Sequence, residues 1–196
     1  LGLEFFDTYG PDGIRNLQKL EIPIFLDLKI HDIPQTVKKT IDTLSSLKPD
    51  ILNVHALGGK KMMQYALESL SNNSPYTQLV AVTILTSLDN DDLQMMKIDI
   101  STKDLVSSLA KLTKESGLSG VVCSSEEIKL VREACGENFK IIVPGIRPEG
   151  SDKNDQKRIM TPKEAITLGA DHLVIGRPIT ESKDPRKTAK EIVNSI

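Results

Sequence analysis

The chain has 196 residues, and its 25 Lys and Arg residues against 27 Asp and Glu residues give a formal charge of −2. That length suits a single domain over residues 1–196 with a sizeable core. The near-balanced charge excludes the basic excess expected of a nucleic-acid or membrane-surface binder, so we expect no nucleic acid and no membrane among the partners. Aromatic residues make up only 4% of the chain, so the core must be mostly aliphatic.

Features that direct a protein to a compartment point to the cytoplasm. No apolar run approaches the ~20 residues needed to cross a bilayer. The first ten residues, LGLEFFDTYG, lack the basic and apolar regions of a signal peptide. The two cysteines, Cys123 and Cys135, have no CxxC spacing, which fits a reducing compartment better than a disulfide or zinc framework.

Short apolar runs alternate with amphipathic segments along the chain. The runs are nearly continuous and rich in β-branched residues, as strands covered on both faces should be. Strands are expected at residues 22–26, 51–54, 79–82, 121–123, 141–143 and 172–175. Helices are expected at residues 36–47, 105–112, 126–134, 161–168 and 185–196. Residues 1–3, followed by a helix over 12–20, make a seventh strand–helix unit.

Alternation of strand and helix predicts an α/β fold with a parallel sheet. Seven units suit either an open doubly wound sheet or a (β/α)8 TIM barrel that lacks one unit. Polar residues follow many different strands, and they are Asp27, Lys29, His55, Thr86, Arg147 and Arg177. A barrel gathers all its strand ends around one site, whereas an open sheet concentrates its ligands at one switch point. The pattern therefore favours a (β/α)8 TIM barrel in which seven βα units are visible.

The segment Asp27-Leu28-Lys29-Ile30-His31-Asp32-Ile33-Pro34 carries the sharpest chemical pattern. On a strand, Asp27 and Lys29 are two residues apart, so both side chains point the same way. Neighbouring carboxylates favour the ammonium form of a lysine, and a positioned ammonium can act as a general acid. The alternative interpretation is an ordinary surface ion pair, which contributes little.

A second pattern follows two later strands. Arg147 lies in Pro144-Gly145-Ile146-Arg147-Pro148, and Gly176-Arg177 follows the last strand. Barrels frequently bind phosphate with the loops after strands seven and eight. Gly176 allows close backbone approach, the arginines can grip phosphate oxygens, and Gln156 adds an amide from the long loop over 147–159. A glycine turn beside a solvated arginine is the alternative.

Weaker signals surround these two patterns. Thr86 ends a strand with a hydroxyl that can bond a heterocycle, and Asn53 and His55 end another strand, where we expect them to orient neighbours rather than react. No His, Cys or carboxylate set has the spacing of a zinc site. The pairs Met62-Met63 and Met95-Met96 are expected to fill the core.

Three elements in order along the chain carry a resemblance to a known family. They are Asp27-x-Lys29-x-x-Asp32-Ile33-Pro34, Thr83-x-x-Thr86-Ser87, and Pro144-Gly145-Ile146-Arg147-Pro148 with Asp155-Gln156 and Gly176-Arg177-Pro178. Together they resemble orotidine 5′-phosphate decarboxylases of the bacterial type, over nearly the whole chain. The DxKxxD element alone is shared with sugar-phosphate decarboxylases and hexulose-phosphate synthases, and the remaining elements narrow the resemblance.

The resemblance implies a carboxy-lyase that converts orotidine 5′-phosphate to UMP in de novo pyrimidine biosynthesis, without cofactor or metal. Lys29 would donate the proton to C6 of the pyrimidine, and Asp27 would face the departing carboxylate. Asp32 would reach across a homodimer interface into the partner's site. Substrate-binding roles would fall on Ile33, Pro34, Thr36, Thr86, Arg147, Gln156, Gly176 and Arg177.

The family pattern also includes an opening strand with an aspartate for the ribose hydroxyls and a lysine directly before the pair matched by Leu1-Gly2. Neither is among the 196 residues, so the resemblance implies an N-terminally truncated TIM barrel. Two other functions therefore stay open beside the decarboxylase. One is a metal-dependent sugar-phosphate lyase or decarboxylase of the same superfamily, and the other is a phosphate-ligand-binding protein without turnover.

Overall fold

A computed structural model describes residues 1–148 and 160–196, so the predicted loop residue Gln156 lies outside the described residues. The described chain forms two compact units. The first unit comprises residues 1–82 and 112–120, and the second comprises residues 83–111 and 121–196.

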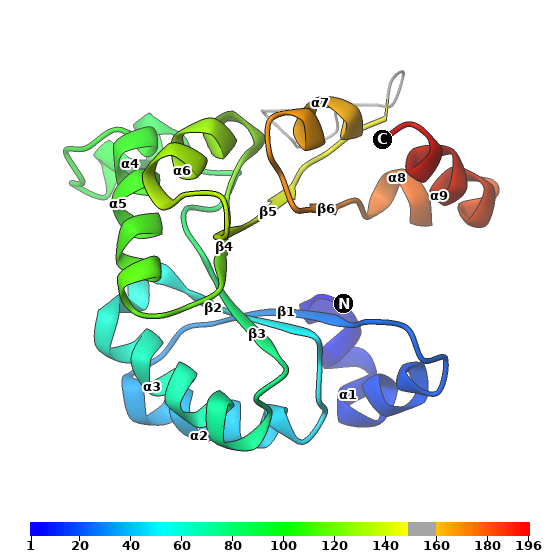
Figure 1. The fold of residues 1–196 in the computed structure, drawn as a ribbon, viewed down its shortest axis with the longest axis horizontal. Coiled ribbons are helices and arrows are strands. Elements are labelled where there is room, and N and C mark those ends of the chain that lie inside the picture. The colour runs from blue at the N-terminus through cyan, green and yellow to red at the C-terminus, as the bar shows by residue number, and fades with distance from the viewer. Residues whose placement is uncertain (149–159) are drawn as a thin grey trace. The chain divides into compact units, whose positions relative to one another are not determined.

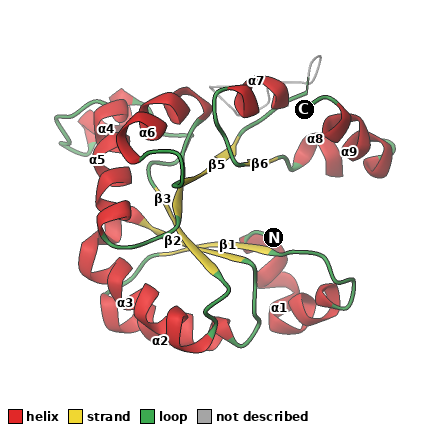
Figure 2. Ribbon diagram, in the orientation of Figure 1, coloured by secondary structure: helices red, strands yellow, loops and turns green. Residues whose placement is uncertain are grey.

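The first unit is built on three parallel strands, which alternate with helices along the chain (Figure 2). Strands β1 (Phe25–Ile30), β2 (Ile51–His55) and β3 (Gln78–Val82) are neighbours in chain order. Helices α2 (Pro34–Ser45) and α3 (Gly59–Asn73) pack against each other below these strands in Figure 1, and a short 3-10 helix, η1 (Ala56–Gly58), leads from β2 into α3. Helix α2 begins at Pro34 because proline suits the first helical position, where no N–H bond is lost.

The N-terminal segment differs from the predicted strand over residues 1–3. Helix α1 (Leu3–Gln18) already begins at Leu3, and its backbone breaks at Gly10, which has φ 59° and ψ −162°. Before the helix, Gly2 forms a single parallel bridge with Asp27 of β1. The seventh unit is therefore not confirmed, because the described residues contain six strands and residues 1–3 contribute only this bridge.

Strand β1 begins later than predicted, at Phe25 rather than at residue 22. Pro23 has no N–H to give to a ladder, and Ile22 is 55% exposed, so the start of the apolar run stays outside the sheet. The strand also extends to Ile30 instead of ending at residue 26. Asp27 and Lys29 therefore lie within the strand and not in the loop after it.

The second unit carries strands β5 (Lys140–Pro144) and β6 (His172–Val174), which pair in parallel, and most of β4 (Gly120–Val122). Its remaining elements are α4 (Asn90–Met95), α5 (Thr102–Glu115), η2 (Ser125–Glu127), α6 (Ile128–Cys135), α7 (Pro162–Thr167), α8 (Arg177–Thr180) and α9 (Pro185–Asn194). Helix α5 passes into the first unit at residue 112. Helices α8 and α9, orange to red in Figure 1, pack against each other.

Each unit has an aliphatic core, as the scarcity of aromatic residues predicts. Fully buried side chains of the first unit include Leu26, Leu52 and Met63, and those of the second include Ile128 and Ile142. The prediction for Met62-Met63 is confirmed, since both are 0% exposed. The prediction for Met95-Met96 is wrong, because these residues end the six-residue helix α4 and are 81% and 52% exposed.

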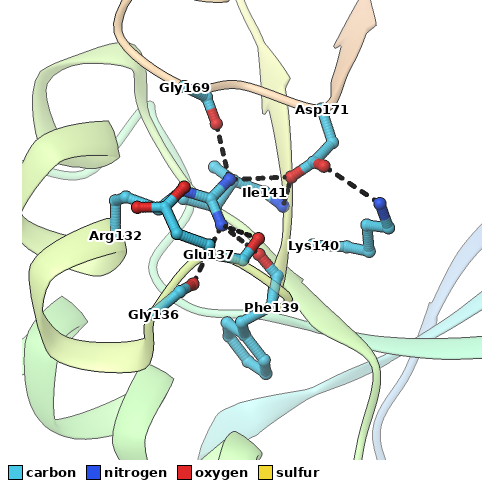
Figure 3. Close-up of polar contacts among 8 residues, drawn as sticks. All are labelled: Arg132, Gly136, Glu137, Phe139, Lys140, Ile141, Gly169 and Asp171. Carbon is cyan, nitrogen blue, oxygen red and sulfur yellow. Dashed lines mark hydrogen bonds and ion pairs between the residues drawn. The ribbon is translucent and has the colours of Figure 1, made fainter.

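A largely enclosed arginine of α6 ties together the loops that lead into β5 and β6 (Figure 3). The Arg132 guanidinium donates to a carboxylate oxygen of Asp171 at 2.9 Å and to four backbone carbonyls at 2.6–2.9 Å. The carbonyls belong to Gly136, Glu137, Phe139 and Gly169. One side chain thus satisfies loop carbonyls that are otherwise costly to bury.

Asp171 completes this cluster from the other side. Its carboxylate accepts from the N–H of Ile141 at 2.9 Å and from Lys140 Nζ at 3.1 Å, besides Arg132. Burial alone would raise the pKa of Asp171, but these hydrogen bonds outweigh it and hold the pKa below its usual range. The cluster lies at the amino ends of β5 and β6.

The predicted α/β class with parallel strands is confirmed. Within each unit the strand order follows the chain, and neither shows the order reversal of a doubly wound sheet among its described strands. None of the helices formed by residues 1–148 and 160–196 combines the length and apolar character needed to span a membrane.

Candidate active site

The Asp27–Lys29 pair predicted from the sequence forms on β1. Lys29 Nζ lies 2.7 Å from Asp27 Oδ1, and the side chains are 34% and 23% exposed. The pair is therefore reachable from solvent while both groups are largely enclosed. This geometry places a cation and an anion side by side at one point of the strand, as a proton donor beside a charged substrate group requires.

The backbone that presents Lys29 is unusual. Lys29 has φ 51°, in the left-handed region that residues with a Cβ seldom adopt. The pairing of β1 with β2 shifts register here, because Leu26 pairs with Leu52 whereas Ile30 pairs with Val54. Strand alternation alone therefore does not explain why the two side chains meet; the irregularity in β1 turns Lys29 onto the carboxylate.

Asn53 of β2 holds both members of the pair. Its Nδ2 donates to Asp27 Oδ1 at 2.6 Å, and its Oδ1 accepts from the backbone N–H of Lys29 at 2.7 Å. Asn53 is fully buried. The expectation that Asn53 orients its neighbours agrees with these contacts. The sequence signal for it is one amide in the otherwise apolar run Ile51-Leu52-Asn53-Val54.

His55 ends β2 and stacks on His31, which follows β1. The ring centroids are 5.2 Å apart and the planes differ by 21°. Burial lowers the pKa of His55, and the charges of His31 and Lys29 lower it further. Its Nδ1 is buried without a hydrogen-bond partner among the described residues. The neutral imidazole is thus the favoured form beside the Lys29 ammonium.

The remaining predicted residues of the first unit lie on the surface around the start of α2. Asp32, Ile33 and Thr36 are exposed, Ile33 by 67%, while Pro34 is half-buried. Asp32 Oδ1 accepts from the N–H of Ile33 at 2.6 Å, which holds the carboxylate beside the helix start.

The other predicted residues belong to the second unit. Thr86 follows β3 and is half-buried, while Gly176 and Arg177 follow β6, where Arg177 begins α8. Arg147 follows β5 and is only 5% exposed. Arg147 Nη1 donates to the Ile146 carbonyl at 3.0 Å, and Arg147 Nε finds no hydrogen-bond partner among residues 1–148 and 160–196.

Two further features bear on the choice of site. A cavity of about 660 Å³ in the second unit is lined by α7 residues such as Pro162 and Thr167 and by Ser195, and none of the predicted site residues that the structure describes lines it. Across the part of the chain that the structure describes, no three His, Cys, Asp or Glu side chains are placed to hold a metal ion together.

Parallel strands in an α/β fold, an enclosed Lys–Asp pair on one strand and arginines after two others are features typical of the class of barrel enzymes that bind phosphate ligands. Comparison with protein families narrows this class. Residues 1–192 match the model of the "Orotidine 5'-phosphate decarboxylase / HUMPS family". The chain belongs to this family, and the resemblance seen in its motifs is confirmed.

Two solved structures show the same fold. The chain is similar to orotidine 5′-phosphate decarboxylase from Lactobacillus acidophilus, with 38% identity, a TM-score of 0.88, and coverage of 99% of this chain and 84% of that one. It is also similar to an uncharacterized conserved protein from Geobacillus kaustophilus, with 36% identity, a TM-score of 0.85, and coverage of 98% and 85%.

Proposed function

We propose that the chain decarboxylates orotidine 5′-phosphate to UMP in pyrimidine biosynthesis, with Lys29 as the proton donor and without cofactor or metal. The observation that carries the proposal is the 2.7 Å contact between Lys29 Nζ and Asp27 Oδ1. Asn53 Nδ2 donates a hydrogen bond to the same carboxylate oxygen. Family membership supports the substrate class, a small nucleotide.

The chemistry needs only charges in fixed positions. The bond between C6 and the carboxylate breaks, CO₂ leaves, and the electron pair stays at C6. The Lys29 ammonium stabilises this charge as it develops and then transfers its proton to C6, after which solvent reprotonates the amine. The Asp27 carboxylate, beside the substrate carboxylate, favours departure of that group and keeps the ammonium aligned through their ion pair.

Binding of the rest of the substrate falls to residues after the other strands. Arg147, Gln156, Gly176 and Arg177 bind the phosphate, and Thr86 contacts the pyrimidine. The buried Arg147 guanidinium supports this assignment, because a cation enclosed to this degree gains most from an anionic partner. Energy from phosphate binding then supports the reaction at the distant C6.

The active form in this proposal is a cytoplasmic homodimer of a single TIM-barrel domain. Asp32 of one protomer completes the site of its partner, with Ile33, Pro34 and Thr36 around it. The exposure of Ile33 and the fixed Asp32 carboxylate support a contact surface here. Two buried, reduced thiols suit a reducing compartment.

A metal-dependent sugar-phosphate lyase is the second candidate, because the matched family model covers both kinds of enzyme. A phosphate-ligand-binding protein without turnover is the third. The decisive assay follows loss of orotidine 5′-phosphate absorbance in the presence of a chelator. The proposal predicts turnover that persists in chelator and falls about 10³-fold or more in Lys29→Ala.

The matched control is Lys111→Ala, which removes an exposed lysine from α5 and should leave turnover unchanged. Absence of orotidine 5′-phosphate turnover, with Mg²⁺-dependent turnover of a sugar phosphate instead, would favour the lyase. Tight UMP binding without any turnover would favour the binding protein, and either result would overturn the decarboxylase.

A further inference from the structure

Asn53 is a buried polar residue inside a parallel sheet. It is 0% exposed, and its neighbours Leu52 and Val54 in β2 are equally buried. On the β3 side its backbone pairs with Val80 in regular register. A carboxamide in such a place is costly unless its donor and acceptor are both used, and here both are.

The β1 side of Asn53 is where the ladder is irregular. Between the Leu26–Leu52 and Ile30–Val54 pairs, β1 has three residues, 27–29, whereas β2 has only Asn53. A bulge of this kind leaves backbone groups without ladder partners. The Asn53 side chain takes the place of the missing ladder, because its Oδ1 accepts from the Lys29 N–H at 2.7 Å.

The same side chain also fixes the carboxylate. Asn53 Nδ2 donates to Asp27 Oδ1 at 2.6 Å, the oxygen that also accepts from Lys29 Nζ at 2.7 Å. Only a group with one acceptor and one donor a short distance apart can hold an N–H and a carboxylate together. An aspartate of equal size would accept from Lys29 but would repel Asp27.

We infer that Asn53 is a positioning residue, which holds Lys29 in its left-handed backbone conformation and aims the Asp27–Lys29 pair at the substrate. This inference rests on the proposed function for its effect on catalysis. A non-glycine residue at φ 51° is strained, and this conformation persists only where its surroundings enforce it. The Asn53 carboxamide is the group that contacts the Lys29 backbone there.

The experiment compares Asn53→Ala and Asn53→Asp with the parent chain and with Asn73→Ala. Asn73 is a matched control, since it also donates from Nδ2 to a carboxylate, that of Asp42 at 2.9 Å, but lies on α3 away from the pair. The readouts are kcat and KM for orotidine 5′-phosphate, the Kd of UMP, and amide hydrogen exchange of Lys29 by NMR.

In Asn53→Ala, kcat should fall about 100-fold, because small misplacements of a catalytic group cost this much. UMP affinity should stay within about threefold of the parent value, because the phosphate-binding residues are unchanged. Exchange of the Lys29 amide should speed up at least about tenfold in Asn53→Ala but stay slow in Asn53→Asp, which keeps the acceptor. Asn53→Asp should lose kcat nevertheless, and Asn73→Ala should match the parent chain.

A kcat within about twofold of the parent in either Asn53 variant would overturn the inference while leaving the decarboxylase proposal intact. Fast exchange of the Lys29 amide in the parent chain would overturn it without any variant. If the parent chain does not turn over orotidine 5′-phosphate at all, the proposed function fails, and the exchange comparison still decides whether Asn53 holds Lys29.

Discussion

At the residue scale, Lys29 combines an ion pair with a strained backbone. Its ammonium contacts Asp27, and its φ of 51° turns the side chain out of the regular strand alternation. The sequence spacing predicts that Asp27 and Lys29 meet. It does not predict the left-handed conformation, because lysine has no intrinsic preference for it and the neighbouring strand imposes it.

Asn53 and His55 differ in how far the sequence reveals them. An amide inside a run of apolar β-branched and aliphatic residues already indicates a special contact. The stacking of His55 on His31 brings together two residues that are 24 positions apart, and only the pairing of β1 with β2 creates it.

The lowered pKa of His55 makes stability depend on pH. Below its ordinary value of 6.5 the unfolded chain binds a proton at His55 that the folded chain still resists, because of burial, His31 and Lys29. The folded state therefore loses stability as pH falls through that value, and the loss levels off below the folded pKa. Stability from this group is fully present at higher pH.

Urea unfolding at about pH 7.5 and about pH 5.5 measures this effect. The parent chain should lose more stability between these pH values than His55→Gln, which has no proton to bind at this position. Equal losses in the two proteins would show that His55 does not titrate differently in the folded state.

At the element scale, the starts of α7 and α9 are among the best predicted features. Thr161 caps α7, since its hydroxyl accepts from the Glu164 N–H, and Asp184 caps α9 by accepting from the Lys187 N–H. Both caps precede a proline at the first helical position, a local signal that the sequence carries in full. Strands β2, β3 and β5 likewise begin and end within one residue of the prediction.

The errors at this scale come from tertiary context. Gly10-Pro11 indicates a break in a helix, and the backbone does break at Gly10. Helical residues nevertheless lie on both sides of this break, and α1 therefore begins at Leu3 rather than at residue 12. Helix α3 lacks a side-chain cap, so the sequence gives no local signal for where it starts. Met95 and Met96 are apolar, but α4 has only six residues and buries Leu93 instead.

The Arg132 cluster gives the element-scale prediction. Arg132→Met should destabilise the chain by about 2–4 kcal/mol, because it removes one of the three donors to the half-buried Asp171 carboxylate and the shared donor of several loop carbonyls. Denaturant unfolding measures the change.

The control is Lys187→Met, which removes an exposed ion pair with Glu191 at 3.8 Å. Its effect should be at most about 1 kcal/mol, since exposed pairs contribute little. Similar losses in the two variants would contradict a special role for the Arg132 cluster.

At the scale of the whole molecule, the predicted site residues are shared between the two compact units. Asp27, Lys29 and Asp32 belong to the first, while Thr86, Arg147 and Arg177 belong to the second. Local sequence patterns locate each of these residues at or near a strand end. What they cannot supply is the side-chain geometry within each unit, which depends on register and packing.

The proposed homodimer predicts complementation between inactive variants. Lys29→Ala and Asp32→Ala should each be inactive alone, because every site of the proposed homodimer then lacks one of the two groups. Mixing them under conditions that exchange subunits should restore about a quarter of parent activity, since half of the dimers are mixed and each contains one intact site.

Light scattering at micromolar concentration should give the mass of a dimer. A mixture that stays inactive although subunit exchange is demonstrated would show that Asp32 acts within its own protomer, and a monomer by light scattering would contradict the dimer itself.

The position of the Arg132 cluster has a consequence for how such a chain can change over time. In the second unit it lies before β5 and β6, whereas Arg147 and Arg177 follow the same strands at their opposite ends. Substitutions around Gly136, Glu137 and Gly169 can therefore raise or lower the melting temperature without altering the residues proposed to bind phosphate. Changes in this region can therefore adapt the stability of the unit to a warmer or colder habitat independently of turnover.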